Sequence, residues 1–177
     1  MYYGGIRAHD VANGLGVRVT LFVSGCPHQC KGCFNEETWD YQYGKPFTDA
    51  EIEEIVEDLK KPEIQGLTLL GGEPLAPPNR PVVCQVLRRV KADVWEKDIW
   101  CYTGYLYETL CKDPDPCLEE ILSYVDVLVD GPFVLEKKSL MLKFRGSANQ
   151  RIIDVRKTRQ RGEVVLVDLE SQGGGKP

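Results

Sequence analysis

The sequence predicts an α/β fold built on a mostly parallel sheet, and three observations support this prediction. Short apolar runs rich in β-branched residues alternate along the chain with segments whose apolar residues recur at helical spacing. Several of these runs end in loops that contain glycine. A chain of 177 residues is also shorter than the roughly 250 residues of a complete eight-stranded barrel. We therefore expect a partial (β/α) barrel with right-handed crossovers.

The first half of the chain predicts two strands and two helices. Val17 to Val23 is rich in β-branched residues and forms the first predicted strand. Thr48 and Glu51 form a capping box that starts a helix, and Leu67 to Leu70 reads as a short buried strand. Pro81 suits the first turn of the second helix. The apolar faces of the two helices are Ile52, Ile55, Val56 and Leu59, and Val83, Val86, Leu87 and Val90.

The second half of the chain continues this alternation. The predicted elements are strands at Ile99 to Tyr102 and Val125 to Val129, helices at Tyr105 to Leu110 and Cys117 to Tyr124, and a last candidate strand at Val164 to Val167. We expect residues 1–170 to form a single domain. Residues 171–177, SQGGGKP, are expected to form a disordered tail.

Glycine-containing loops follow four of the predicted strands: Ser24-Gly25, Gly71-Gly72, Thr103-Gly104 and Asp130-Gly131. The carboxyl ends of parallel strands meet at one edge of a sheet, and α/β folds bind their ligands there. We therefore expect these four loops to line one site.

Composition and the N-terminal sequence predict a cytoplasmic protein. Hydrophobic residues make up 42% of the chain and charged residues 28%, as in ordinary soluble proteins. No apolar run approaches the roughly 20 residues of a membrane span, so no membrane partner is expected. The N-terminal MYYGGIRAHD lacks the segments of a signal peptide. In a reducing compartment, clustered thiols are more often metal ligands or redox groups than disulfides.

The stretch GCPHQCKGCFN, Gly25 to Asn35, places three of the seven cysteines at C-x3-C-x2-C spacing: Cys26, Cys30 and Cys33. Thiolates favour iron–sulfur clusters, zinc or copper(I). A loop this short can hold three corners of a cuboidal 4Fe-4S cluster and leave the fourth iron without a protein ligand. Electron carriers use four cysteines, so the pattern favours a cluster that performs chemistry at its open iron.

Zinc sites are the alternative to this cluster. His28 would complete a site of three cysteines and one histidine, although it lies inside the spacer between two of the cysteines, where joint ligation is awkward. A more distant cysteine is the other choice: Cys84, Cys101, Cys111 or Cys117. The first two lie in an apolar helix and an apolar strand and are expected to be core residues. The last two are expected to be incidental thiols.

From Gly14 the chain reads GLGVRVTLFVSGCPHQCKGCFN, which resembles the signature of the glycyl-radical-enzyme activating proteins of the radical S-adenosylmethionine superfamily. The resemblance covers roughly Gly4 to Asp154 and implies a partial barrel of the radical S-adenosylmethionine type. It also implies a 4Fe-4S cluster held by the three cysteines, which would be both the catalytic and the metal-binding residues, with S-adenosylmethionine bound at the open iron. The matching positions are Gly14, Gly16, Arg18, Phe22, Gly25, Cys26, Cys30, Cys33, Gly32 and Asn35.

The resemblance also implies which residues hold S-adenosylmethionine. GGEP resembles the glycine-rich motif that binds the methionine amino group. Its glycines let the backbone approach a ligand closely, and Glu73 is expected to accept a hydrogen bond from the ammonium. The implied residues are Gly32, Cys33 and Phe34 against the adenine with Asn35 next to them, Gly71, Gly72, Glu73 and Pro74 at the amino group, and Tyr102 and Asp130 at the nucleoside or the methionine.

Two later stretches, VDVLVDGPF and FRGSANQRIID, resemble the members of this family that act on anaerobic ribonucleotide reductase. The resemblance implies an oxidoreductase that cleaves S-adenosylmethionine reductively and generates a glycyl radical on the large reductase subunit. An electron donor such as flavodoxin or ferredoxin is then required. The alternatives are an activase of another glycyl-radical enzyme, such as pyruvate formate-lyase, and a non-catalytic, zinc-stabilised binding module.

The basic residues are concentrated late in the chain. Between Lys137 and Arg161 there are nine basic residues and one acid, in a chain of formal net charge −5. This segment is either a solvated basic face or a docking surface for a partner protein. A nucleic acid partner is not expected, because the segment lacks regular aromatic interleaving and the whole chain is acidic. Arg145 and Arg151 are expected to hold a carboxylate, to pair with the partner enzyme or to staple a turn by hydrogen bonds.

Overall fold

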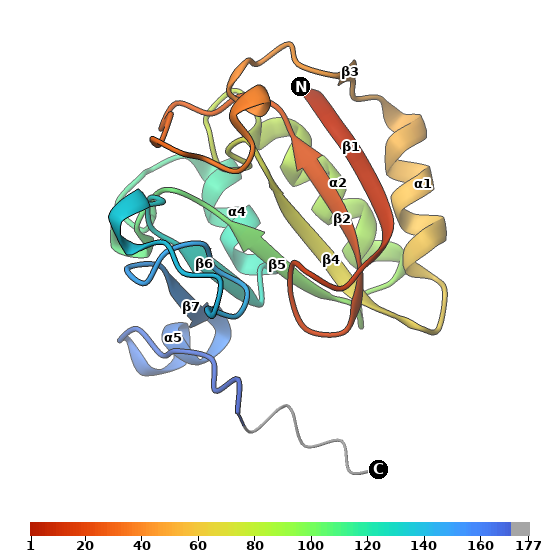
Figure 1. Cartoon of the computed structure of the whole chain (residues 1–177). Helices are drawn as coiled ribbons and strands as arrows, with labels where there is room; N and C mark the ends of the chain where they lie inside the picture. Colours follow the sequence, from red (N-terminus) through yellow and green to blue (C-terminus); the bar gives the residue numbers. More distant parts are fainter. Residues whose placement is uncertain (171–177) are drawn as a thin grey trace.

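An open sheet of seven strands organises the chain in the computed structural model, which describes residues 1–170 (Figure 1). The strand order is β3-β1-β2-β4-β5-β6-β7. The four central strands run parallel, as predicted: β2 (Val17–Val23), β4 (Ile64–Gly71), β5 (Asp98–Tyr102) and β6 (Val127–Asp130). The three outer strands pair antiparallel: β1 (Tyr2–Asp10), β3 (Lys45–Pro46) and β7 (Arg151–Asp154).

The strand predicted at Val164 to Val167 is wrong. Only an isolated bridge joins Leu166 to Ile153 of β7. Val167 N donates to the Ile152 carbonyl at 2.8 Å, and Asp154 N donates to the Val165 carbonyl at 2.8 Å. The chain turns at residues 169–170, so the pairing stops after this single bridge.

Three helices cover one face of the sheet (Figure 1): α1 (Asp49–Leu59), α2 (Arg80–Asp93) and α4 (Pro116–Tyr124). The predicted apolar faces of α1 and α2 are buried in the main core. The capping box is confirmed, because Glu51 Oε2 accepts from Thr48 N at 2.6 Å and Thr48 Oγ1 accepts from Ala50 N at 3.3 Å. The shorter elements are α3 (Tyr107–Leu110), α5 (Val155–Arg161) and the 3-10 turns η1 (Glu36–Trp39) and η2 (Leu135–Lys137).

The two faces of the sheet have different coverings. Alternation along β5 sends Ile99 and Cys101 into the core beneath the helices, whereas Trp100 and Tyr102 lie on the opposite face. Trp100 packs there with Val129 of β6. Loops rather than helices cover this second face (Figure 1), and the space beneath them becomes the site described below.

No helix in residues 1–170 is long and apolar enough to cross a membrane. The tail predicted over residues 171–177 lies outside the described part of the chain. The assignment of residues 1–170 to a single domain stays a prediction.

A buried arginine braces the amino-terminal ends of the parallel strands. Arg18 of β2 is fully buried and donates hydrogen bonds to Thr68 Oγ1 at 2.7 Å and to the Leu67 carbonyl at 3.0 Å. Its guanidinium also forms an ion pair with Asp98 at the start of β5. One side chain thereby holds β2, β4 and β5 in register.

Replacing Arg18 with methionine should lower the free energy of unfolding by about 3 kcal/mol, because it removes a buried charge and leaves its acceptors unpaired. Urea denaturation of the two proteins measures the difference. Arg161→Met, at an exposed position of α5, is the matched control and should change the free energy by less than about 0.5 kcal/mol. An Arg18→Met protein as stable as the wild type would show that the brace is dispensable.

Candidate functional site

A cavity of about 600 Å³ opens on the loop-covered face, at the carboxyl ends of the parallel strands. Sheet residues on this face, Phe22, Leu70 and Tyr102, contribute to its lining. Its size lies within the range of small-molecule sites. All four of the predicted loops reach it, through Cys26, Gly71 and Gly72, Thr103 and Gly104, and Gly131. The prediction that these loops converge on one site is therefore confirmed.

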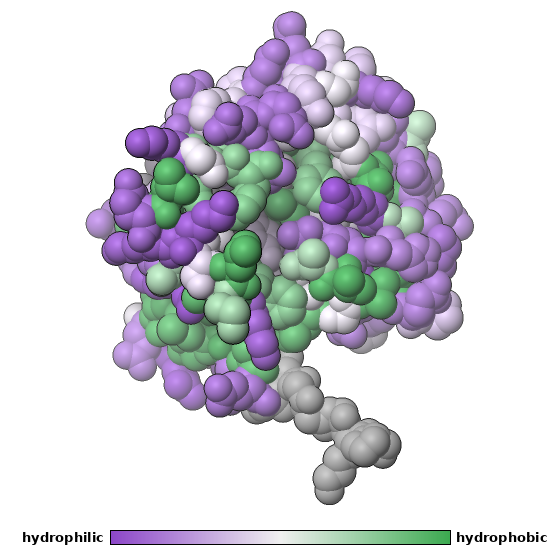
Figure 2. Space-filling view, viewed as in Figure 1, coloured by the Kyte–Doolittle hydropathy of each residue, from purple (hydrophilic) through white to green (hydrophobic). Residues whose placement is uncertain are grey.

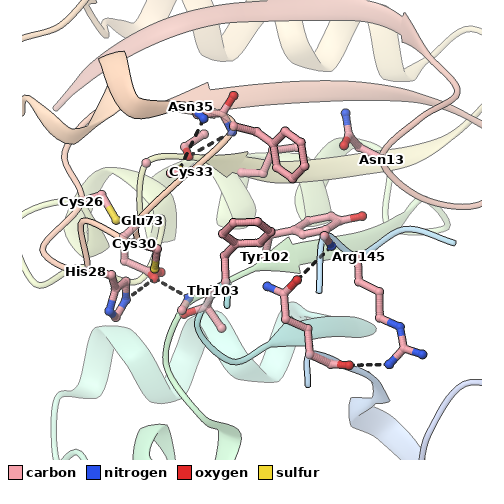
Figure 3. Close-up of a pocket in the computed structure, with 18 of the residues that line it drawn as sticks. Asn13, Cys26, His28, Cys30, Cys33, Asn35, Glu73, Tyr102, Thr103 and Arg145 are labelled. Atoms are coloured by element: carbon pink, nitrogen blue, oxygen red, sulfur yellow. Dashed lines mark hydrogen bonds and ion pairs between the residues drawn. The ribbon is translucent and has the colours of Figure 1, made fainter. Parts of the chain in front are cut away.

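The three cysteines of the predicted cluster all line this cavity (Figure 3). Each is a free thiol; Cys26 is buried, and Cys30 and Cys33 are half-buried. Cys33 N donates to the Cys30 carbonyl at 3.1 Å, which closes a tight turn between them. Cys26 N donates to the Trp39 carbonyl at 3.1 Å and ties the start of the loop to η1. The loop thus brings its three thiols to one space.

The environment of Cys26 controls its protonation. Burial raises the pKa of the Cys26 thiol, backbone hydrogen bonds from His28 and Gln29 lower it, and the nearby Glu73 carboxylate raises it. The net pKa is raised. A thiol of this kind is protonated at neutral pH, so binding of a metal to it would release a proton.

The chemistry of the donor set suits an iron–sulfur cluster, because thiolates are the usual ligands of such clusters and three free thiols line the cavity. Within residues 1–170, no three Cys, His, Asp or Glu side chains are gathered closely enough to hold one metal ion. His28, the nearest candidate for a fourth zinc ligand, bonds Glu73 through Nε2. Cys84 and Cys101 are buried in the core, as expected.

The Glu73 carboxylate joins three loops (Figure 3). Its side chain is 1% exposed. Oε1 accepts from Leu75 N at 2.9 Å, and Oε2 accepts from Gly104 N at 2.8 Å. Oε2 also lies 2.8 Å from His28 Nε2, which donates because a carboxylate can only accept. A carboxylate offers about four acceptor positions, so one is left for a ligand, and the predicted bond from an ammonium stays a prediction.

The two glycines of GGEP are required by close packing. Gly71 has φ +108°, and a Cβ on Gly72 would come within 2.6 Å of the Gly25 carbonyl oxygen. Glu73 N donates to that same carbonyl at 2.8 Å. The GGEP turn therefore lies directly against the cysteine loop, with the backbone of both glycines at the cavity. Pro74 follows the turn and is outside the cavity lining.

The residues on either side of Cys33 divide between the cavity and the loop itself. Phe34 and Asn35 both line the cavity. Phe34 meets the Phe133 ring edge to face at 5.4 Å between centroids, and Asn35 Nδ2 donates to the Gly71 carbonyl at 3.5 Å. Gly32 does not line the cavity; it has φ +73°, and a Cβ there would lie 2.9 Å from the Leu135 side chain.

Tyr102 lies at the cavity, and Asp130 does not. The Tyr102 hydroxyl is buried without a hydrogen-bond partner among residues 1–170, and burial raises the pKa of its phenol. Asp130 is fully buried and accepts from Arg151 Nε at 2.9 Å and from Tyr107 N at 2.8 Å. Its carboxylate thereby holds β7 and the start of α3, and the ligand contact expected for Asp130 stays a prediction.

Sequence patterns gave no expected role to most of the residues on the side of the cavity opposite the cysteines. Figure 3 shows Asn13 and Arg145 there. Arg145 Nη1 donates to the Gln150 carbonyl, so it staples a turn and borders the cavity at once. The sequence signal for this side is the FRGSANQ stretch, in which Arg145 is the one residue with an expected role. Lining residues without a role expected from the sequence include Arg7, Asn13, Trp39, Phe144 and Gln150.

The fold and the site are those of an iron–sulfur domain, because residues 12–153 match the family described as a 4Fe-4S single cluster domain. The chain is 48% identical over 145 residues to the anaerobic ribonucleoside-triphosphate reductase-activating protein of Vibrio cholerae, covering 81% of this chain and 91% of the relative. The proteins of the same name from Escherichia coli K12 and Enterobacteria phage T4 are 42% and 45% identical over 149 and 154 residues, covering 83% and 86% of this chain and 94% and 93% of each relative. The chain belongs to the family of anaerobic ribonucleoside-triphosphate reductase-activating proteins.

Replacing Glu73 with glutamine should lower the free energy of unfolding by about 2 kcal/mol, because the new amide group faces a buried donor that it cannot accept from. Urea denaturation measures the loss. Glu54→Gln, at an exposed position of α1, is the matched control and should be nearly neutral. Equal stability of the two variants would contradict the role given to the Glu73 carboxylate.

Replacing Tyr102 with phenylalanine should raise the free energy of unfolding by about 1 kcal/mol, because a buried hydroxyl without a partner is costly. Thermal or urea unfolding measures the gain. Tyr124→Phe removes a hydroxyl that bonds Glu120 at 3.1 Å, so this control should lose stability instead. If Tyr102→Phe loses as much stability as the control, the Tyr102 hydroxyl has a partner.

Proposed function

We propose that the chain is a radical S-adenosylmethionine enzyme that activates anaerobic ribonucleotide reductase. The observation that carries the proposal is that the three-cysteine loop and the GGEP turn border one cavity. The name of the relatives and the matched 4Fe-4S domain support it.

Cys26, Cys30 and Cys33 would hold a 4Fe-4S cluster and leave one iron open to the amino and carboxylate groups of S-adenosylmethionine. The chemistry that these cofactors supply when bound is a one-electron reductive cleavage to methionine and a 5′-deoxyadenosyl radical, for removal of a hydrogen atom from a backbone glycine of the large reductase subunit. The tasks of the chain itself are to bind, to orient and to exclude water.

The side chains around the cavity suit these tasks. Gly71 and Gly72 offer backbone groups to the methionine amino group, next to the remaining acceptor position of Glu73. Phe34 supplies an apolar wall for the adenine. The unpartnered Tyr102 hydroxyl is a donor for a polar group of the nucleoside or the methionine, and such a bond would offset the cost of its burial.

The open sheet corresponds in this proposal to the partial barrel of the radical S-adenosylmethionine type, with residues 1–170 as one domain. A sheet that does not close leaves a lateral opening for the glycine-bearing loop of a large protein. An electron donor such as flavodoxin or ferredoxin would provide the reducing equivalent. The free state of all seven thiols suits the reducing cytoplasm.

After anaerobic reconstitution with iron and sulfide, the reduced chain should form 5′-deoxyadenosine from S-adenosylmethionine. With the reductase added, it should produce a glycyl radical detectable by EPR. Cys30→Ala should abolish both products, because it removes one thiolate from the cluster. Cys111→Ala, at an exposed thiol outside the cavity lining, is the matched control and should retain both.

Two results would change this proposal. Zinc without iron or sulfide in anaerobically purified protein would favour a zinc-stabilised binding module instead. Radical formation on pyruvate formate-lyase, with none on ribonucleotide reductase, would support the proposed radical chemistry and identify pyruvate formate-lyase as the partner instead.

A further inference from the structure

One segment at the edge of the cavity is held at its two ends by backbone contacts, while its middle, or tip, is exposed to solvent. An isolated bridge joins Lys138 to Ser147, and Ala148 N donates to the Lys137 carbonyl at 2.9 Å. Between these anchors the chain makes an excursion along the cavity, which Ser139, Leu140 and Leu142 line. We call residues 137–143 the rim segment.

The tip of the rim segment exposes two adjacent apolar side chains. Leu140 is 88% exposed and Met141 is 91% exposed, the highest values for large apolar residues in residues 1–170. Single exposed apolar residues are common on protein surfaces. These two, however, share a segment with Lys138, whose Nζ lies 4.6 Å from the ring centroid of Phe34, itself 57% exposed. Figure 2 shows hydrophobic side chains standing among hydrophilic ones around a hollow on this face, a pattern typical of interaction sites.

The rim segment also carries positive charge that the protein does not neutralise. Lys137, Lys138 and Lys143 form no ion pair within the part of the chain that the structure describes. Basic residues later in the predicted basic segment are engaged with internal carboxylates: Arg151 with Asp130, Arg156 with Asp126, and Lys157 with Asp154. The predicted basic segment therefore divides. The lysines of the rim segment lie beside the cavity with no internal carboxylate to neutralise them, so they can meet an acidic surface there.

We propose that the rim segment is the docking surface for the reductase, and that the reductase meets it with an apolar patch flanked by carboxylates. The inference rests on the proposed function, because a glycine that reacts inside the cavity must pass its mouth. The protein that carries this glycine then covers the rim segment. Docking buries the side chains of Leu140 and Met141, gives the lysines acidic partners and closes the cavity to water.

Substitutions in the rim segment outside the cavity lining test this surface. Met141→Asp, and the double variant Lys137→Glu with Lys143→Glu, should each weaken binding to the reductase at least tenfold. The yield of glycyl radical at limiting protein should fall in parallel, while 5′-deoxyadenosine formation without the reductase stays at the wild-type level. Binding by the wild type should weaken as salt is added, and binding by the double variant should respond less.

Matched controls have the same chemistry at exposed positions outside the rim segment. Trp95→Asp places a carboxylate at a side chain that is 75% exposed, and Arg161→Glu reverses an exposed charge on α5. Both should bind the reductase as the wild type does. Equal weakening by the controls would show that overall charge, rather than the rim segment, governs docking and would overturn the proposal.

The remaining outcomes separate this inference from the proposed function. Wild-type binding and radical yield in both rim-segment variants would overturn the docking surface and leave the proposed function in place. If the rim-segment variants lose 5′-deoxyadenosine formation as well as binding to the reductase, the rim segment has no docking role separate from the cavity, and the docking proposal is overturned. A wild-type chain that forms no 5′-deoxyadenosine would overturn the proposed function, and one that does not bind the reductase at all would overturn both.

Discussion

The buried carboxylate of Glu73 is the contact on which the shape of the cavity depends. It joins its own turn to the cysteine loop through His28 and to the loop after β5 through Gly104. The carboxylate itself is closed off from bulk water, and a buried polar group that loses a hydrogen-bond partner costs about 1–3 kcal/mol. The three loops therefore cannot separate without losing this free energy, and the cysteines keep a defined position relative to the GGEP backbone.

The position of this cavity follows from the two different coverings of the sheet. Helices α1, α2 and α4 bury one face in an ordinary apolar core, and the parallel strands bring four loops to the edge above the other face. Strand β7 pairs antiparallel to β6 at the edge, where Arg151 joins Asp130 to Glu108. An edge strand outside the cavity lining thus fixes the loop after β6, from which residues 132–150 extend over the cavity.

Signature residues within one stretch of the sequence have different structural roles. Arg18 braces the amino-terminal ends of the strands, and Gly32 supplies a left-handed backbone conformation beside Leu135. The three cysteines and Asn35 line the cavity. A match to such a signature therefore reports the fold as well as the chemistry, because some of its positions are held by backbone geometry alone.

Local patterns in the sequence determine the parallel strands and the main helices of this protein, since apolar periodicity and capping depend only on near neighbours. They did not predict the antiparallel strands β1 and β7. Val17 to Val23, the capping box at Thr48 and the spacing of the cysteines were readable for that reason, and the meeting of the loops followed from the parallel order. Tertiary structure alone decided the contacts between distant residues. A carboxylate at a strand end has the same local pattern whether it faces a ligand or, like Asp130, an arginine 21 residues away. The isolation of the Tyr102 hydroxyl and the bond between His28 and Glu73, 45 residues apart, likewise depend on which side chains meet across the folded sheet.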